Sequence, residues 1–139
     1  MGTILRIADA VTAEINRANL FPDFTAERLF IPEYDLKTLK SIKVSVVPKA
    51  IKEINIARTM ESKEIQIDIG IQQKITDERY LEILLNLVEE IADLFTQKRL
   101  ADVPEALCIR TENNPVYDPE HLRQMRQFTS VITLTFKVL

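Results

Sequence analysis

Glycine, cysteine, histidine and tryptophan are all scarce in this chain of 139 residues. It has two glycines, one cysteine, one histidine and no tryptophan. Loops that cradle phosphate groups need several glycines, because their backbone adopts conformations that a Cβ atom disfavours. Gly2 and Gly70 lie far apart in the sequence, which argues strongly against a nucleotide-binding loop of that kind.

The single cysteine, Cys108, has no internal partner for a disulfide bond, which fits a reducing compartment. It lies between Leu107 and Ile109 in a short apolar segment, so we expect a buried thiol. Arg110, two positions away, is the feature that would favour a reactive thiol instead.

The single histidine, His121, follows Glu120 in a polar segment, and we expect its side chain to be solvated. A general base or a metal ligand is the alternative, but metal sites gather several His, Cys or carboxylate ligands at defined spacing. We therefore predict no metal and no other cofactor.

Long apolar runs and a strong net charge are also missing. Nowhere do about 18 apolar residues follow one another, so we expect no membrane-spanning segment, and no secretion signal is evident. The net charge of −3 gives no general attraction to nucleic acid or to anionic membranes. A nucleic-acid adaptor that uses the local basic residues stays open as a weaker alternative; these residues are Lys37, Lys40, Lys43, Lys49, Lys52, Arg58 and Lys63.

Two amphipathic helices are predicted in a chain whose length suits one domain over residues 1–139. Residues 3–19 carry apolar side chains at spacings of three and four, and Pro22 prevents continuation. The second helix is expected over residues 76–99, capped by Thr76 and followed at its negative end by Lys98 and Arg99.

Alternating apolar and polar residues predict strands between and after these helices. The clearest case is Ile65, Ile67, Ile69 and Ile71, which alternate with polar residues and Gly70. Further strands are expected at 28–31, 42–47, 106–111 and 128–138, with Pro48 marking either the end of a strand or a sheet edge. Residues 50–60 are expected to be irregular or extended, and residues 113–127 to form a polar connection.

This order of elements, α-β-β-β-α-β-β, predicts an α+β fold. We expect a mostly antiparallel or mixed sheet of four to five strands, with both helices packed on one face. Strand and helix do not alternate, so a doubly wound parallel sheet is not expected.

Acidic residues on the second helix are the main candidates for catalytic or metal-binding residues. Two of them, for example Asp77 and Glu82, could form a carboxylate pair that binds a divalent metal for hydrolysis. A solvated helix face explains the same residues without catalysis, so we predict a protein that is not an enzyme, with a small metal-dependent hydrolase as the alternative from another class.

Several stretches of the chain resemble phage tail terminator or tail completion proteins, which cap tails at the head-proximal end. The matching stretches are Ile42–Pro48, Ile54–Arg58, Ile65–Lys74, Leu84–Leu94 and Phe128–Val138. The resemblance covers nearly the whole chain as an order of elements, and none of its stretches is a catalytic signature.

The resemblance implies a structural protein of the virion tail that assembles in the bacterial cytoplasm, from a phage or a prophage. It also implies a homo-oligomeric ring, a hexamer, that stops polymerisation of the tail tube protein and joins a head-completion protein. Contact with nucleic acid is implied only as DNA passing through the ring. The related alternative to a tail terminator is another head–tail connector or neck protein. We nominate residues in two connections, 58–63 and 113–127, as candidate contacts with other chains. They are Arg58, Glu61, Lys63, Tyr117, Arg123 and Arg126.

Overall fold

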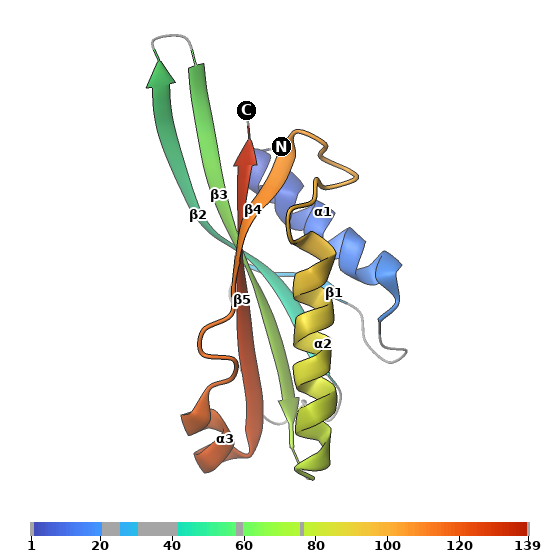
Figure 1. Ribbon diagram of the computed structural model, residues 1–139. Helices are drawn as coiled ribbons and strands as arrows, with labels where there is room; N and C mark the ends of the chain where they lie inside the picture. The colour runs from blue at the N-terminus through green and yellow to red at the C-terminus, as the bar shows by residue number, and fades with distance from the viewer. Residues whose placement is uncertain (1, 21–25, 31–41, 58–59, 76, 139) are drawn as a thin grey trace.

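A computed structural model describes residues 2–20, 26–30, 42–57, 60–75 and 77–138 (Figure 1). Its helices are α1 (Thr3–Ala18), α2 (Arg79–Phe95) and α3 (Pro119–Met125). Its strands are β1 (Ala26–Arg28), β2 (Lys43–Ala57), β3 (Met60–Lys74), β4 (Ala106–Glu112) and β5 (Gln127–Val138). None of the helices in these ranges is both long enough and apolar enough to cross a membrane.

The strands form one mixed sheet of five strands in the order β1-β2-β3-β5-β4. β1 pairs with β2 in parallel, and the other three pairs are antiparallel. α1 and α2 pack on the same face of this sheet, as Figure 1 shows. The α+β fold predicted from the sequence, with two helices on one face of a mixed sheet, is confirmed.

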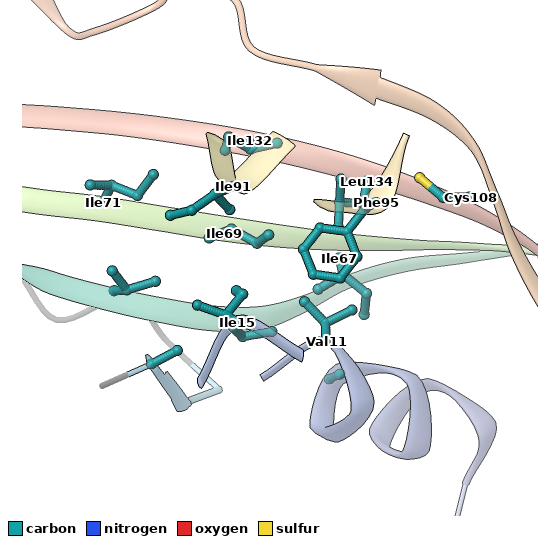
Figure 2. Packing of buried hydrophobic residues seen from close by; sticks show 14 of the residues in the cluster. Val11, Ile15, Ile67, Ile69, Ile71, Ile91, Phe95, Cys108, Ile132 and Leu134 are labelled. Carbon is teal, nitrogen blue, oxygen red and sulfur yellow. The ribbon is translucent and has the colours of Figure 1, made fainter. Parts of the chain in front are cut away.

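The core lies between these two helices and the sheet. Ile65, Ile67, Ile69 and Ile71 are fully buried on β3, because alternate residues of a strand point to the same side. Opposite them lie the apolar stripes of the helices, including Val11 and Ile15 of α1 and Ile91 and Phe95 of α2 (Figure 2).

The strand that contains Pro48 is longer than we predicted. β2 continues through Pro48 to Ala57, with a register shift between Pro48 and Ala50. The Val46 carbonyl accepts a hydrogen bond from Leu29 N–H at 2.9 Å on the outer side of β2, and Pro48, two residues on, faces the same way. Its missing N–H therefore breaks no ladder bond, so Pro48 marks an edge and not an end.

α2 is shorter at both ends than predicted. Thr76 lies outside the described residues, and Glu78 holds the N-cap position, while the Asp77 carboxylate accepts the Arg79 N–H at 3.0 Å. At the other end Thr96 leaves the helical conformation. The Lys98 ammonium still donates to the Asp93 carbonyl at 3.2 Å, which is the interaction expected of a cation near the helix end.

The segment that we expected to be a polar connection contains the short helix α3. Asp118 caps it, since one carboxylate oxygen accepts the N–H groups of Glu120 and His121 at 2.9 and 3.1 Å, and Pro119 occupies the first turn. None of its seven residues is buried, so apolar periodicity gave no signal for this helix. The first predicted strand is also displaced, to Ala26–Arg28.

Candidate interaction surfaces

One face of the sheet carries neither α1 nor α2. We call it the open face, and its central rows are filled by small or polar side chains: Ser45, Val47, Gln66, Asp68, Gly70, Gln72, Thr129, Val131, Thr133 and Thr135. Asp68 ties neighbouring strands together there, because it accepts the Thr133 hydroxyl at 2.7 Å and lies 3.6 Å from the Lys49 ammonium. Polar side chains thus dominate the open face, although Ser45, Gln72, Thr129 and Thr135 are themselves buried there.

A depression of about 90 Å³ lies near the middle of the open face. Gly70 forms its floor, paired with Ser45 on β2 and with Val131 on β5. The walls include Val47, which is nearly buried, and Val131, which is 39% exposed.

Nothing in the local structure requires glycine at position 70. Its φ is not positive, and a Cβ atom built there would meet no atom within 4 Å. Glycine inside a strand lowers stability, and it often marks a place where another chain approaches closely. The missing side chain at Gly70 thus leaves space in the depression.

Substituting Gly70→Ala should raise the free energy of unfolding by about 0.5–1 kcal/mol. Alanine restricts the unfolded chain and adds a Cβ atom to the strand without a steric clash. Chemical denaturation followed by circular dichroism measures the change. A clear loss of stability would show that the space above Gly70 is not free.

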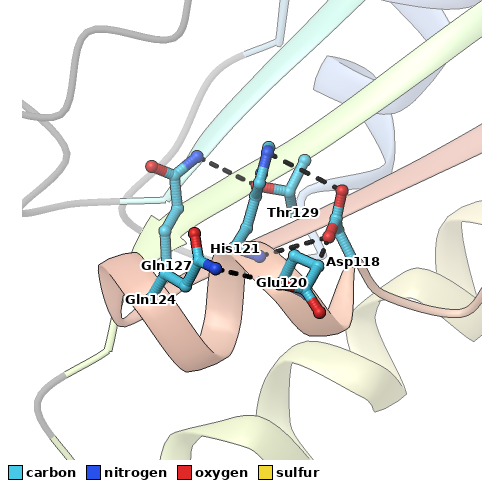
Figure 3. Close-up of polar contacts among 6 residues, drawn as sticks. All are labelled: Asp118, Glu120, His121, Gln124, Gln127 and Thr129. Atoms are coloured by element: carbon cyan, nitrogen blue, oxygen red, sulfur yellow. Dashed lines mark hydrogen bonds and ion pairs between the residues drawn. The ribbon is translucent and has the colours of Figure 1, made fainter.

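α3 packs against one end of β5 through a small polar cluster (Figure 3). The Nδ1 atom of His121 lies 2.9 Å from the Thr129 hydroxyl, and Nε2 lies 3.7 Å from the Asp118 carboxylate. The Gln127 side-chain amide, which is 1% exposed, donates to the same hydroxyl at 2.9 Å. His121, which we expected to be solvated, is half-buried with 28% of its side chain exposed, because α3 places the ring against Thr129 of β5.

Replacing Asp118 by alanine should destabilise the protein by about 1 kcal/mol, the usual effect of removing an N-cap. Two N–H groups of α3 lose their acceptor in this variant. Hydrogen exchange of the Glu120 and His121 amides, measured by NMR, should accelerate. The Asp102→Ala variant is a suitable control, since Asp102 contacts Arg17 at an exposed position; equal effects of both changes would contradict the capping role.

Arg123 and Arg126, two of the predicted contact residues, lie together beside a groove between α3 and the start of α2. Its floor is apolar, and the residues that line it are Ile75, Glu78, Leu81, Leu122, Arg123 and Arg126. The Arg123 guanidinium lies 3.3 Å from the Glu120 carboxylate, and the Arg126 carbonyl accepts the Ile75 N–H at 2.7 Å.

The other predicted contact residues are spread over the molecule. Lys63 lies near the far end of β3, 3.7 Å from the Glu53 carboxylate, and the tyrosine ring of Tyr117 packs against Phe128 with 6.1 Å between centroids. Arg58 lies outside the described residues, and for Glu61 only the backbone within β3 is described. The structure thus brings Arg123 and Arg126 together and separates them from Lys63.

The outward face of α2 is acidic and has an apolar spot that the sequence analysis missed. Tyr80 and Ile83 are 48% and 43% exposed, which is unusual beside a helix face so well buried on its other side. Carboxylates surround them at helical spacing, at Glu82, Glu89, Glu90 and Asp93. In the sequence, the position of Ile83 outside the apolar stripe that contains Leu84 and Leu87 is the signal that could have identified this exposed side chain.

His, Cys, Asp and Glu are the side chains that could form a metal-binding group in the described part of the chain. No group of three or more His, Cys, Asp or Glu residues is arranged to hold a metal ion among the described residues. Asp77, named for the hydrolase alternative, is held by Arg79 at 2.8 Å, and this ion pair lowers the pKa of its carboxyl. Cys108 is 1% exposed as predicted, and burial raises the pKa of its thiol.

Comparison with known proteins gives matches among solved structures. No protein-family model matches the chain, and no curated protein matches it. The chain is similar to the sheath/tube terminator, in its extended state, of an extracellular contractile injection system called PVC, with 20% identity and a TM-score of 0.47 over 99% of this chain. It spans 57% of the length of that terminator.

A second solved structure, described without a function, has 15% identity and a TM-score of 0.56, covering 98% of this chain and 94% of the other. This likeness supports the fold over nearly the whole of both chains. The terminator belongs to the same class of protein as the sequence resemblance indicates. At 20% identity and a TM-score of 0.47, the match to the terminator adds no argument about the function of this chain.

Proposed function

We propose that this protein is a structural component of a phage or phage-like tail, and that copies of it form a ring that terminates tail tube polymerisation. The ring is a hexamer that binds the tail tube protein on one side and a head-completion protein on the other. DNA passes through its centre. The protein acts by contact between protein surfaces, without catalysis or a cofactor, and it belongs to the virion tail after assembly in the bacterial cytoplasm.

The observation that carries this proposal is that the sheet leaves surfaces for other chains on one face and along one edge. α1 and α2 cover a single face, and the opposite face has a depression at its centre. β1 pairs with β2 at Ala26–Arg28 only, opposite Val44–Val46. Within the described residues the rest of the outer edge of β2 has no strand beside it, and such edges pair with other chains.

The β2–β3 hairpin adds to this support. Each of its strands has 15 residues, and in Figure 1 the hairpin extends past the end of β5. Ile51 on this part of β2 is 55% exposed, although its cross-strand partner Ile65 is fully buried. A projecting hairpin with an exposed isoleucine suits contact with a neighbouring subunit or with the tube.

Deletion of the gene from a strain that produces the particles tests the proposed role. We expect tails of irregular and excessive length in electron micrographs, restored to normal length by the gene in trans. Tails of normal length beside unjoined heads would assign the protein to head–tail joining instead. Normal particles in normal numbers would contradict both structural roles.

A further inference from the structure

Two surfaces on opposite sides of the molecule differ in charge, and one has a depression where the other exposes apolar side chains. One is the open face of the sheet, with its depression over Gly70. The other is the outward face of α2, which lies beyond the core on the other side of the sheet and exposes Tyr80 and Ile83. Because these surfaces face away from each other, they cannot meet within one chain.

Charge distinguishes the two surfaces. The strand register places more basic side chains than carboxylates on the open face, and Lys49 lies over this face through its contact with Asp68. The basic side chains are Lys43, Lys49, Lys52, Lys74, Arg110 and Lys137, and the carboxylates are Glu64, Asp68 and Glu112. The exposed side of α2 instead carries Glu82, Glu89, Glu90 and Asp93, with Arg79 as its one cation.

The two surfaces also differ in shape, since an apolar side chain projects from one and the other has a depression. Ile83 lies three residues before Asn86 and seven before Glu90, so it borders the acidic face of α2, and it is 43% exposed there. The depression over Gly70 has room for about one such side chain and is walled by Val47 and Val131. A glycine that lowers stability and meets no local need is explained if the side chain of another molecule fills the space above it.

We propose that the outward face of α2 in one copy packs onto the open face of the next copy, with Ile83 entering the depression over Gly70. This inference rests on the proposed ring and specifies its contact. The two surfaces differ, so the contact is head-to-tail, and its repetition closes a ring where the rotation from one copy to the next divides a full turn. The acidic helix and the basic sheet face align the two copies, and high ionic strength should weaken the contact.

Two variants that each destroy one side of the contact provide the test. Gly70→Leu occupies the depression from within the chain, starting from a Cβ atom that meets no other atom within 4 Å. Ile83→Lys removes the apolar side chain and places a cation opposite the basic face. Each variant should stay folded by circular dichroism and should need at least about tenfold higher concentration than the original chain for half-maximal assembly in sedimentation velocity. Val116→Lys is the matched control, since Val116 is similarly exposed at 47% and lies on neither surface.

Mixing the two variants gives the sharpest result. The Gly70→Leu chain keeps its α2 face, and the Ile83→Lys chain keeps its open face, so one intact contact can form between them. At concentrations where each variant by itself is monomeric, we expect the mixture to form dimers and no rings.

The possible failures are distinguishable. If the original chain forms rings and both variants form them equally well, this contact is overturned while the proposed ring stands. If the original chain stays monomeric at every concentration, both the ring and the contact are overturned. If the mixture of variants forms full rings, the contact is not head-to-tail through these faces.

Discussion

Replacing Phe95 by alanine should lower the free energy of unfolding by about 3–5 kcal/mol. Phe95 ends α2, is 1% exposed and belongs to the core cluster that also contains Ile67 and Leu134 (Figure 2). The truncation removes buried apolar surface and leaves a cavity that rigid neighbouring strands close only in part. Since domains of this size are stable by about 5–15 kcal/mol, the loss is a large share of the total.

Denaturant titration of Phe95→Ala measures this effect, and Phe30→Ala is its control. Phe30 is 69% exposed, and its described contact is with the Arg28 guanidinium, 4.8 Å from the ring centroid. An exposed contact of this kind contributes about 0.5–1 kcal/mol. Equal destabilisation by the two substitutions would show that α2 does not close the core through Phe95.

Introducing an aspartate at Ile67 should prevent folding, whereas the same residue at the neighbouring Gln66 should have little effect. Ile67 is fully buried between β3 and the helices, and a carboxylate there would lose its hydration without gaining a partner. Gln66 points to the open face, where its side chain keeps contact with solvent. The two positions are adjacent, so they differ in the face of the sheet and in little else.

Circular dichroism and thermal unfolding of the purified Ile67→Asp and Gln66→Asp variants measure this contrast. We expect no cooperative transition for Ile67→Asp. For Gln66→Asp we expect the free energy of unfolding to change by less than about 1 kcal/mol. Comparable loss of structure in both variants would mean that the two faces of β3 are buried alike. That result would remove the open face on which the proposed contact depends.

The parts of the fold with strong periodicity were predictable from the sequence. The alternating isoleucines at 65, 67, 69 and 71 identified β3 and its buried face, because a one-residue slip would expose all four. The apolar stripe of residues 3–19 identified α1 within one residue of its end. Both signals are local, and tertiary structure did not override them.

The errors arose where the structure depends on contacts distant in the sequence. Pro48 is tolerated inside β2 because β1 covers only the rows before it, which the local sequence does not reveal. α3 depends on Asp118 and Pro119 at its start and on packing of His121 against Thr129. No apolar stripe marks a helix that buries none of its own residues.

The contact surfaces were only partly predictable. Arg123 and Arg126 were named from the polar connection and do lie together, beside the groove at the start of α2. The Gly70 depression was missed, although a glycine amid alternating isoleucines is a signal of close approach. Its meaning depends on which face of β3 lacks helices, and that is a property of the folded chain.

We have proposed that copies of this chain meet through unlike surfaces and close into a ring. Native mass spectrometry of the purified protein, with the Gly70→Leu variant beside it, tests this most directly. We expect a closed species of six times the 16.0 kDa of one chain, and its loss in the variant. A species of one chain at every concentration, or a dimer that Gly70→Leu leaves unchanged, would contradict the claim.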